Sequence, residues 1–128
     1  MEILLDTNFI ITCAKQGIDF DAFVNGITSE EVKWIVPEEV LSELRGLRSG
    51  NKVRKKDLEA IDIGLKMIQK INVKVLRISD KNLDVDTKIV NYIKDKPIIL
   101  ATLDKLLKSR VDNRILTVRG KKKLEIFQ

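Results

Sequence analysis

The sequence of 128 residues contains no histidine, a single cysteine and few aromatic residues. The absence of histidine excludes hydrolases that pair a serine or cysteine nucleophile with histidine, and it excludes zinc sites with histidine ligands. Cys13 alone can form neither an intramolecular disulfide nor a cysteine-rich metal site. Because aromatic residues make up only 5% of the chain, stacking on nucleic-acid bases is a poor prospect. Any catalysis must therefore use carboxylates, hydroxyls, lysines or a bound metal ion.

The sequence also lacks segments that direct a protein to or through a membrane. No apolar run approaches the roughly 20 residues that a membrane span needs, and the start, MEILLD, has no basic region of the kind that begins a signal peptide. We therefore expect a soluble, cytoplasmic protein in which residues 1–128 form a single domain. Its 24 lysines and arginines exceed its 19 acids, for a formal charge of +5, which is compatible with a nucleic-acid partner.

Short apolar runs alternate with stretches of helical periodicity along the whole chain. Strands are predicted at Ile3–Leu5, Lys33–Val36, Val73–Ile78, Ile98–Ala101 and Ile115–Val118, with Leu124–Phe127 as a candidate edge strand. Helices are predicted at Phe9–Ala14, at Phe20–Ile27, from Pro37 to the closing Gly50 and Asn51, and at Val53–Ile71, Asp84–Ile93 and Leu103–Val111. Strands that alternate with helices favour an α/β fold with a parallel sheet.

Two aspartates follow apolar strands. Asp6 ends the first predicted strand, and Asp104 comes shortly after the strand at 98–101, with Leu107 three residues further on. In a parallel sheet, functional groups gather at the carboxyl ends of the strands. Taken alone, however, each aspartate is also explained as the N-cap of the helix that follows it.

Two further acids lie at the apolar faces of predicted helices. Glu43 is next to Leu44 and three residues after Val40, while Asp86 is three residues before Ile89. A solvated acid is not expected within an apolar stripe, so both side chains are predicted to point inward. For Asp86, helix capping remains the alternative.

Carboxylates that converge repel one another, and burial adds to their cost. The usual resolution is a divalent cation. Mg²⁺ and Mn²⁺ prefer oxygen ligands and need no histidine, so a set of carboxylates suits these ions better than zinc. The sequence therefore predicts a site for Mg²⁺ or Mn²⁺ if the four acids meet in the fold.

The order of these motifs resembles the PIN domain of metal-dependent ribonucleases. The motifs are DTN at 6–8, a proline-led helix with EL at 43–44, an acid at the head of a helix at 86, and TLD at 102–104. The tail ILTVRGKKKLEIF at 115–127 resembles the PIN nucleases that process ribosomal RNA in archaea and eukaryotes. The resemblance covers essentially the whole chain. It implies a three-layer α/β/α sandwich with a mostly parallel central sheet of about five strands.

The resemblance assigns the catalytic and metal-binding roles to Asp6, Glu43, Asp86 and Asp104, with Asn8 and Thr102 in support. It implies an endoribonuclease in which Mg²⁺ or Mn²⁺ activates water to cleave single-stranded RNA, leaving a 5′-phosphate. The chain departs from the pattern twice. Thr87 stands where many relatives have a second acid, and Leu103 stands where asparagine is frequent. We expect these departures to weaken a second metal site rather than the first.

Basic residues are expected to bind the RNA backbone without strong sequence readout. The candidates are Arg45, Arg119, Lys121 and Lys122, with the RGKKK turn at 119–123 favoured. Each of them alone is also explained as a solvated surface residue.

The resemblance leaves three roles open. The tail favours ribosomal RNA processing or RNA turnover. The alternatives are the toxin of a toxin–antitoxin pair, which would bind a small antitoxin protein, and a non-catalytic RNA-binding scaffold. Because PIN domains often pair, a homodimer is also expected.

Two other acid-rich α/β classes match less well. DVDT at 84–87 invites comparison with phosphatases that carry D-x-D-x-T, but its threonine comes one residue early. A receiver domain would need a phosphoacceptor after a middle strand, and VKVLRIS at 73–79 supplies no clear one.

Overall fold

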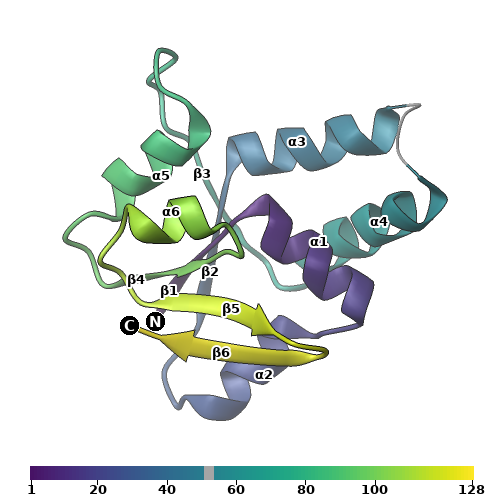
Figure 1. The fold of residues 1–128 in the computed structure, drawn as a ribbon, viewed down its shortest axis with the longest axis horizontal. Helices are drawn as coiled ribbons and strands as arrows, with labels where there is room; N and C mark the ends of the chain where they lie inside the picture. The colour runs from purple at the N-terminus through teal and green to yellow at the C-terminus, as the bar shows by residue number, and fades with distance from the viewer. Residues whose placement is uncertain (51–53) are drawn as a thin grey trace.

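The computed structural model describes residues 1–50 and 54–128 (Figure 1). The elements in chain order are β1 (Glu2–Leu5), α1 (Thr7–Gln16), α2 (Phe20–Ile27), β2 (Lys33–Pro37), α3 (Glu38–Ser49), α4 (Lys55–Lys70), β3 (Lys74–Leu76), α5 (Val85–Ile93), β4 (Ile98–Ala101), α6 (Lys105–Ser109), β5 (Ile115–Arg119) and β6 (Lys123–Phe127). Each predicted strand and helix has its counterpart here; α2 and β4 have the predicted bounds, and the other elements have shifted ends. The predicted helix closure at Asn51 and the predicted helix start at Val53 lie outside the described residues.

The strands form one sheet in the order β3-β2-β1-β4-β5-β6. All neighbouring pairs are parallel except β5 and β6, which are antiparallel. The predicted α/β fold with a mostly parallel sheet is therefore confirmed, and β6 makes six strands rather than about five. From β1 the chain adds β2 and β3 on one side and then returns to add β4 on the other. The switch in strand order therefore falls between β1 and β4, and in open α/β sheets ligands bind at the carboxyl ends of the strands at such a point.

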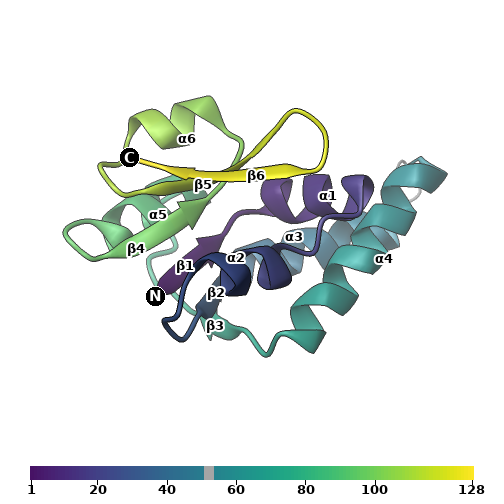
Figure 2. The ribbon, with the colours of Figure 1, turned by 90° about the horizontal axis from the view of Figure 1, so that it is seen from below.

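The two faces of the sheet are covered by different helices. Ile3 and Leu5 of β1 belong to a core with residues of α1, α2, α3 and α4, whereas Leu4 belongs to a second core with Ile89 of α5 and Leu107 of α6. Successive side chains of a strand point to opposite faces, so a strand buried on both faces reads as a continuous apolar run. Figures 1 and 2 show α1, α3 and α4 grouped at one side of the molecule, with α5 and α6 at the other. The expected three-layer arrangement is present.

Helix α6 is shorter than the predicted helix at 103–111. The helix begins after Asp104, because Asp104 has an extended backbone and its side chain caps the backbone N–H groups of Leu106 and Leu107. At the other end, the hydroxyl of Ser109 donates to the backbone oxygen of Leu106 at 2.6 Å. A serine that bonds the backbone in this way competes with helix continuation.

Strand β3 is shorter than the predicted strand at 73–78, because β2, its neighbour in the sheet, ends early. Leu76 pairs with Pro37, the last residue of β2. Pro37 has an extended backbone and directly precedes α3, so the prediction that it lies in the first turn of that helix is wrong. Within the described residues, no helix has both the length and the apolar character needed to span a membrane.

Candidate active site

Asp6 and Thr102 lie at the carboxyl ends of the paired strands β1 and β4. Asp6 follows β1 and Thr102 follows β4, and both are buried, with Asp6 9% exposed. Oδ2 of Asp6 accepts a hydrogen bond from the Thr102 hydroxyl at 2.7 Å, and Oδ1 accepts from the backbone N–H of Thr7 at 2.9 Å. Asp6 is also the N-cap of α1. Capping and a place in an acidic site are therefore compatible for this residue.

Asn8 and Asp104 complete the polar contacts around Thr102. Oδ1 of Asn8 accepts from the backbone N–H of Leu103 at 3.1 Å and lies 3.4 Å from the Thr102 hydroxyl. That hydroxyl in turn accepts from the backbone N–H of Asp104 at 3.1 Å. These bonds join the start of α1 to the segment between β4 and α6. They place Asn8 and Thr102 beside Asp6 and Asp104.

Asp104 caps α6 with one carboxylate oxygen. Its Oδ1 accepts from the backbone N–H groups of Leu106 and Leu107 at 2.9 and 3.2 Å. No side-chain hydrogen bond or ion pair involves Oδ2 in the part of the chain that the structure describes. One oxygen thus fixes the orientation of the carboxylate, while the other is left for a ligand.

Glu43 reaches the site from α3. Its Oε2 accepts from the hydroxyl of Thr7 at 2.9 Å. The prediction that its side chain points into the core is wrong, because Glu43 is exposed while Val40, Leu41 and Leu44 supply the buried face of α3. Glu43 borders that face, and its side chain contacts the first residue of α1, Thr7.

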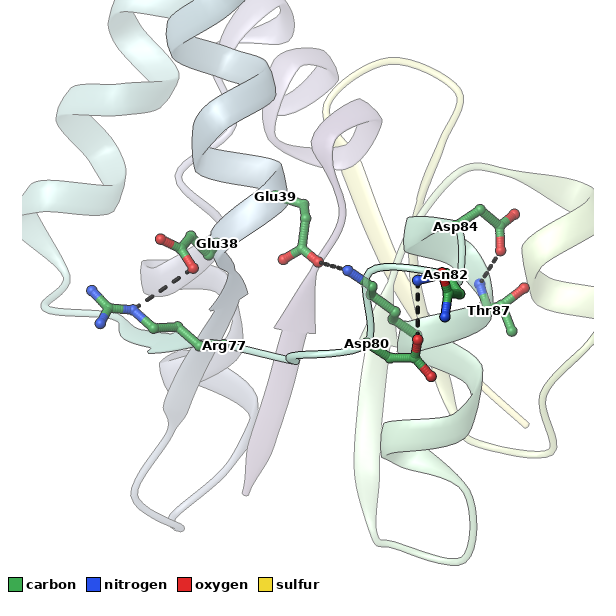
Figure 3. Close-up of polar contacts among 8 residues, drawn as sticks. Glu38, Glu39, Arg77, Asp80, Asn82, Asp84 and Thr87 are labelled. Atoms are coloured by element: carbon green, nitrogen blue, oxygen red, sulfur yellow. Dashed lines mark hydrogen bonds and ion pairs between the residues drawn. The ribbon is translucent and has the colours of Figure 1, made fainter.

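Asp86 lies in the first turn of α5, and Asp84 rather than Asp86 caps this helix. Oδ1 of Asp84 accepts from the backbone N–H of Thr87 at 3.1 Å (Figure 3). The half-buried Asp86 has no side-chain hydrogen bond or ion pair among the described residues. Its carboxylate has no structural partner there to explain its position.

The acids act on one another electrostatically. Burial raises the pKa of Asp6; hydrogen bonds from Thr102 and Thr7 oppose this rise, and the charges of Asp86 and Asp104 add to it. Burial also raises the pKa of Asp86, reinforced by the charges of Asp104, Asp84 and Glu43 and opposed by Arg110. The charges of Asp86 and Asp104 therefore act on Asp6, and those of Asp104 and Glu43 act on Asp86.

The arrangement suits a hard divalent cation in its chemistry. All candidate ligands are carboxylate oxygens, and Asp86 and Oδ2 of Asp104 have no competing bond within the described range. Mg²⁺ and Mn²⁺ prefer such ligands and retain several waters. In the described residues, no three or more cysteine or acidic side chains already stand in a metal-binding group. The case for a divalent cation therefore rests on the carboxylate oxygens as ligands and on the repulsion between the carboxylates.

Two residues near the acids lie outside the predicted site set. Thr7 is the middle residue of DTN, and its hydroxyl holds Glu43. Arg110 donates from Nη2 to the hydroxyl of Thr87 at 2.9 Å, at the position where the resemblance expects a second acid. The DTN motif contained a signal for Thr7, whereas only the tertiary structure brings Arg110 to α5.

The predicted RNA-binding residues are all exposed, on two separate elements. Arg45 lies on α3, two residues beyond Glu43. Arg119 ends β5, with its Nε 2.9 Å from Oε2 of Glu125. Lys121 and Lys122 lie in the turn before β6, and the backbone N–H of Lys122 donates to Oε1 of Gln16 at 2.9 Å. The basic turn is therefore anchored to the last turn of α1.

Comparison with known proteins gives one consistent result. A family model described as a PIN like domain matches residues 3–121. The chain is 31% identical over 130 residues to Ribonuclease VapC4 of Methanocaldococcus jannaschii, covering 98% of this chain and 96% of that protein. Among solved structures, the PIN domain endonuclease Utp24 superposes with a TM-score of 0.77 at 24% identity, covering 98% of this chain and 90% of that one. A domain of a functionally unknown M. jannaschii protein matches with a TM-score of 0.55 at 19% identity, covering 99% and 96%.

Proposed function

This chain belongs to the PIN-like domain family, and from that premise we propose that it is an endoribonuclease that cleaves single-stranded RNA with Mg²⁺ or Mn²⁺. Asp6, Glu43, Asp86 and Asp104 are the proposed metal ligands and catalytic residues. Residues 1–128 are proposed to act as one nuclease domain. The 31% identity to a protein named as a ribonuclease, over nearly the full length of both chains, supports this reaction class.

One observation carries the proposal above all. Asp6 is a buried carboxylate at the switch between β1 and β4, and its pKa is raised by burial and further by Asp86 and Asp104. Folding alone would favour an uncharged residue there, because a buried acid next to other acids is unfavourable. A bound divalent cation reverses that preference.

When bound, the metal ion supplies hydroxide near neutral pH and positive charge beside the phosphodiester. The chain's own residues keep the carboxylates in place. Thr102 and the backbone N–H of Thr7 fix the two oxygens of Asp6, and the Thr7 hydroxyl holds Glu43 at the site. The Asn8 side chain fixes the backbone next to Asp104. None of these roles needs histidine.

Phosphate binding is proposed for Arg45, Arg119, Lys121 and Lys122. Contact with phosphates fixes the position of a strand without reading its sequence. Arg45 would approach from α3 and the other three from the β5–β6 turn. The anchoring of this turn to Gln16 supports a preformed contact.

Cleavage of a 5′-labelled single-stranded RNA with Mn²⁺, and with EDTA, tests this function. We expect Asp86→Asn and Asp104→Asn to lower the rate by about 100-fold or more, since the metal contributes several kcal/mol. Asp86→Asn is the sharper variant, because no side-chain bond in the described residues depends on Asp86. The exposed Asp112 lies in the loop after α6, so Asp112→Asn is the matched control. Cleavage that survives EDTA and both site variants would refute the proposed site.

The biological role is a separate proposal. Ribosomal RNA processing or RNA turnover is the first candidate. The second is the toxin of a toxin–antitoxin pair with a small antitoxin partner, favoured by the identity to Ribonuclease VapC4. Growth arrest on expression of the wild type, absent with Asp86→Asn and relieved by a co-expressed neighbouring gene, would establish the toxin role. Expression without any effect on growth would favour processing or turnover.

A further inference from the structure

Three cations gather on the β5 side of Asp104: Lys105 and Lys108 of α6, and Arg119 of β5. We call them the α6–β5 cluster. The backbone N–H of Thr102 donates to the oxygen of Leu116 at 3.1 Å, so the last residues of β5 extend beyond the end of β4. Arg119 ends that extension, Lys105 directly follows Asp104 in the chain, and the charges of Asp104 and Arg119 both act on Lys108. The cluster thus borders the acidic site.

Lys108 is held in place by the protein. Its Nζ donates to the hydroxyl of Thr117 at 3.2 Å and lies 5.9 Å from the centre of the Phe127 ring. Thr117 is buried at 4% exposure, and Lys108 itself is half-buried. A side chain that is already ordered loses less conformational freedom when it binds a ligand. Lys108 therefore differs from a freely moving surface lysine.

The charges in the cluster are poorly balanced. Burial, followed by the charges of Lys105 and Arg119, lowers the pKa of Lys108, and Asp104 opposes this. Within the described residues, the only ion pair of the three is between Arg119 and Glu125, whose side chains are 71% and 44% exposed. Such an exposed pair stabilises little. An anion placed among these cations would relieve their repulsion.

We propose that Lys105, Lys108 and Arg119 form a subsite for one backbone phosphate of single-stranded RNA, next to the phosphate that the acidic site cleaves. The proposal rests on the proposed function and names how its substrate is held. Lysine ammonium groups are point charges that suit phosphate oxygens. The ring of Phe127 already interacts with Lys108, whose Nζ lies 5.9 Å from the ring centre, so the cluster is assigned to a phosphate rather than to a stacked base.

Binding of a 2′-O-methyl oligonucleotide in Ca²⁺, followed by fluorescence anisotropy, tests the subsite apart from cleavage. A gel after each titration verifies that the strand is intact. A series of strands, each with one uncharged methylphosphonate linkage, locates the phosphate. For the wild type we expect one linkage whose neutralisation weakens binding about 10-fold, as for the loss of a charge-assisted hydrogen bond.

Lys108→Met should weaken binding of the fully charged strand about 10-fold and remove the effect of that one linkage. For Lys108→Met, the slope of log K against log salt concentration should be smaller in magnitude by about 0.7, the value for one phosphate contact with a single strand. Lys105 is exposed, so Lys105→Met should not affect folding. In this variant, neutralising the same linkage should weaken binding less than it does in the wild type. Lys33→Met is the control, because Lys33 is exposed and begins β2 at the opposite end of the sheet.

Equal losses at every linkage, or equal losses in Lys33→Met and Lys108→Met, would overturn the subsite in favour of diffuse attraction. So would unchanged binding in both Lys105→Met and Lys108→Met. These results are independent of the cleavage test, because they measure binding without reaction. If the wild type cleaves no RNA but still binds the strand with that one neutral linkage more weakly, the nuclease proposal is overturned and the subsite stands.

Discussion

The hydroxyl of Thr102 lies 2.7 Å from Oδ2 of Asp6 and joins the end of β4 to the end of β1. The two residues are 96 positions apart in the chain. Both are buried, so the hydrogen bond is protected from water. It stabilises the charged form of a carboxylate that burial otherwise disfavours. The pair therefore links the fold of the sheet to the chemistry of the site.

Replacement of Thr102 by valine removes this donor while keeping a β-branched side chain. We expect the free energy of unfolding to fall by about 1–3 kcal/mol, because a buried oxygen loses its partner. The pKa of Asp6 should rise further, and Mn²⁺ affinity at neutral pH should fall. Urea unfolding and titration calorimetry measure the two effects. Thr102→Ser should restore most of both, and the half-buried Thr12 of α1 gives the control Thr12→Val.

Asp6 should make metal-free stability fall as pH rises. Its pKa in the folded chain is raised above 3.8, so the folded chain binds this proton more tightly than the unfolded chain does. The resulting stability is present below the unfolded pKa and is lost as pH rises through the folded pKa. In EDTA at pH 7, Asp6→Asn should therefore be at least as stable as the wild type. Thermal unfolding from pH 3 to 8 measures this.

Two comparisons make the Asp6 test specific. A hydrogen bond from Lys15 lowers the pKa of the exposed Asp57, so Asp57→Asn should shift stability in the opposite sense at neutral pH. Mn²⁺ at 100 times its Kd should stabilise the wild type by about 2.7 kcal/mol and leave Asp6→Asn unchanged. If Asp6→Asn is less stable than the wild type in EDTA at pH 7, the charged Asp6 does not destabilise the metal-free fold and the prediction is wrong.

Gly64 allows α4 to approach α1 closely. A Cβ at this position would lie 2.8 Å from Cγ2 of Ile10, a fully buried side chain. We expect Gly64→Ala to destabilise the protein by about 1–3 kcal/mol through overpacking. In α3, a Cβ on Gly46 would meet nothing within 4 Å, so Gly46→Ala should stabilise by about 0.4–1 kcal/mol. If Gly64→Ala and Gly46→Ala shift the urea midpoint equally, α1 and α4 are not closely packed at Gly64.

Two ion pairs near the site should differ in strength (Figure 3). Lys88 of α5 lies 3.0 Å from Glu39 of α3, with side chains 11% and 26% exposed. Arg77 lies 3.7 Å from Glu38, with side chains 79% and 54% exposed. Lys88→Met should cost about 1–3 kcal/mol, between the values for exposed and buried pairs, because Glu39 is left half-buried without its partner. Arg77→Met should change the unfolding free energy by less than about 0.5 kcal/mol; a loss as large as that of Lys88→Met would show that burial does not set their difference.

The sequence determined the elements and their class. Apolar runs such as Ile98–Ala101 have the length and continuity of a strand buried on both faces, so local pattern was enough to predict them. The acids at 6 and 104 were also visible, because each follows such a strand. The hydrogen bond from the backbone of Leu103 to Asn8, 95 positions away, was not predictable, because it depends on the pairing of β1 with β4.

Only the tertiary structure decided what each acid and cation is near. Periodicity placed Glu43 at the apolar face of α3, but packing against α1 left it exposed and bonded to Thr7. On the other side of the sheet, the position of α6 brought Arg110 to Thr87 of α5 and Lys108 to Thr117 of β5. A sequence pattern reports which face of an element is buried, because burial follows its local period. It does not report which polar groups meet across elements, because those contacts depend on strand order and on the switch between β1 and β4.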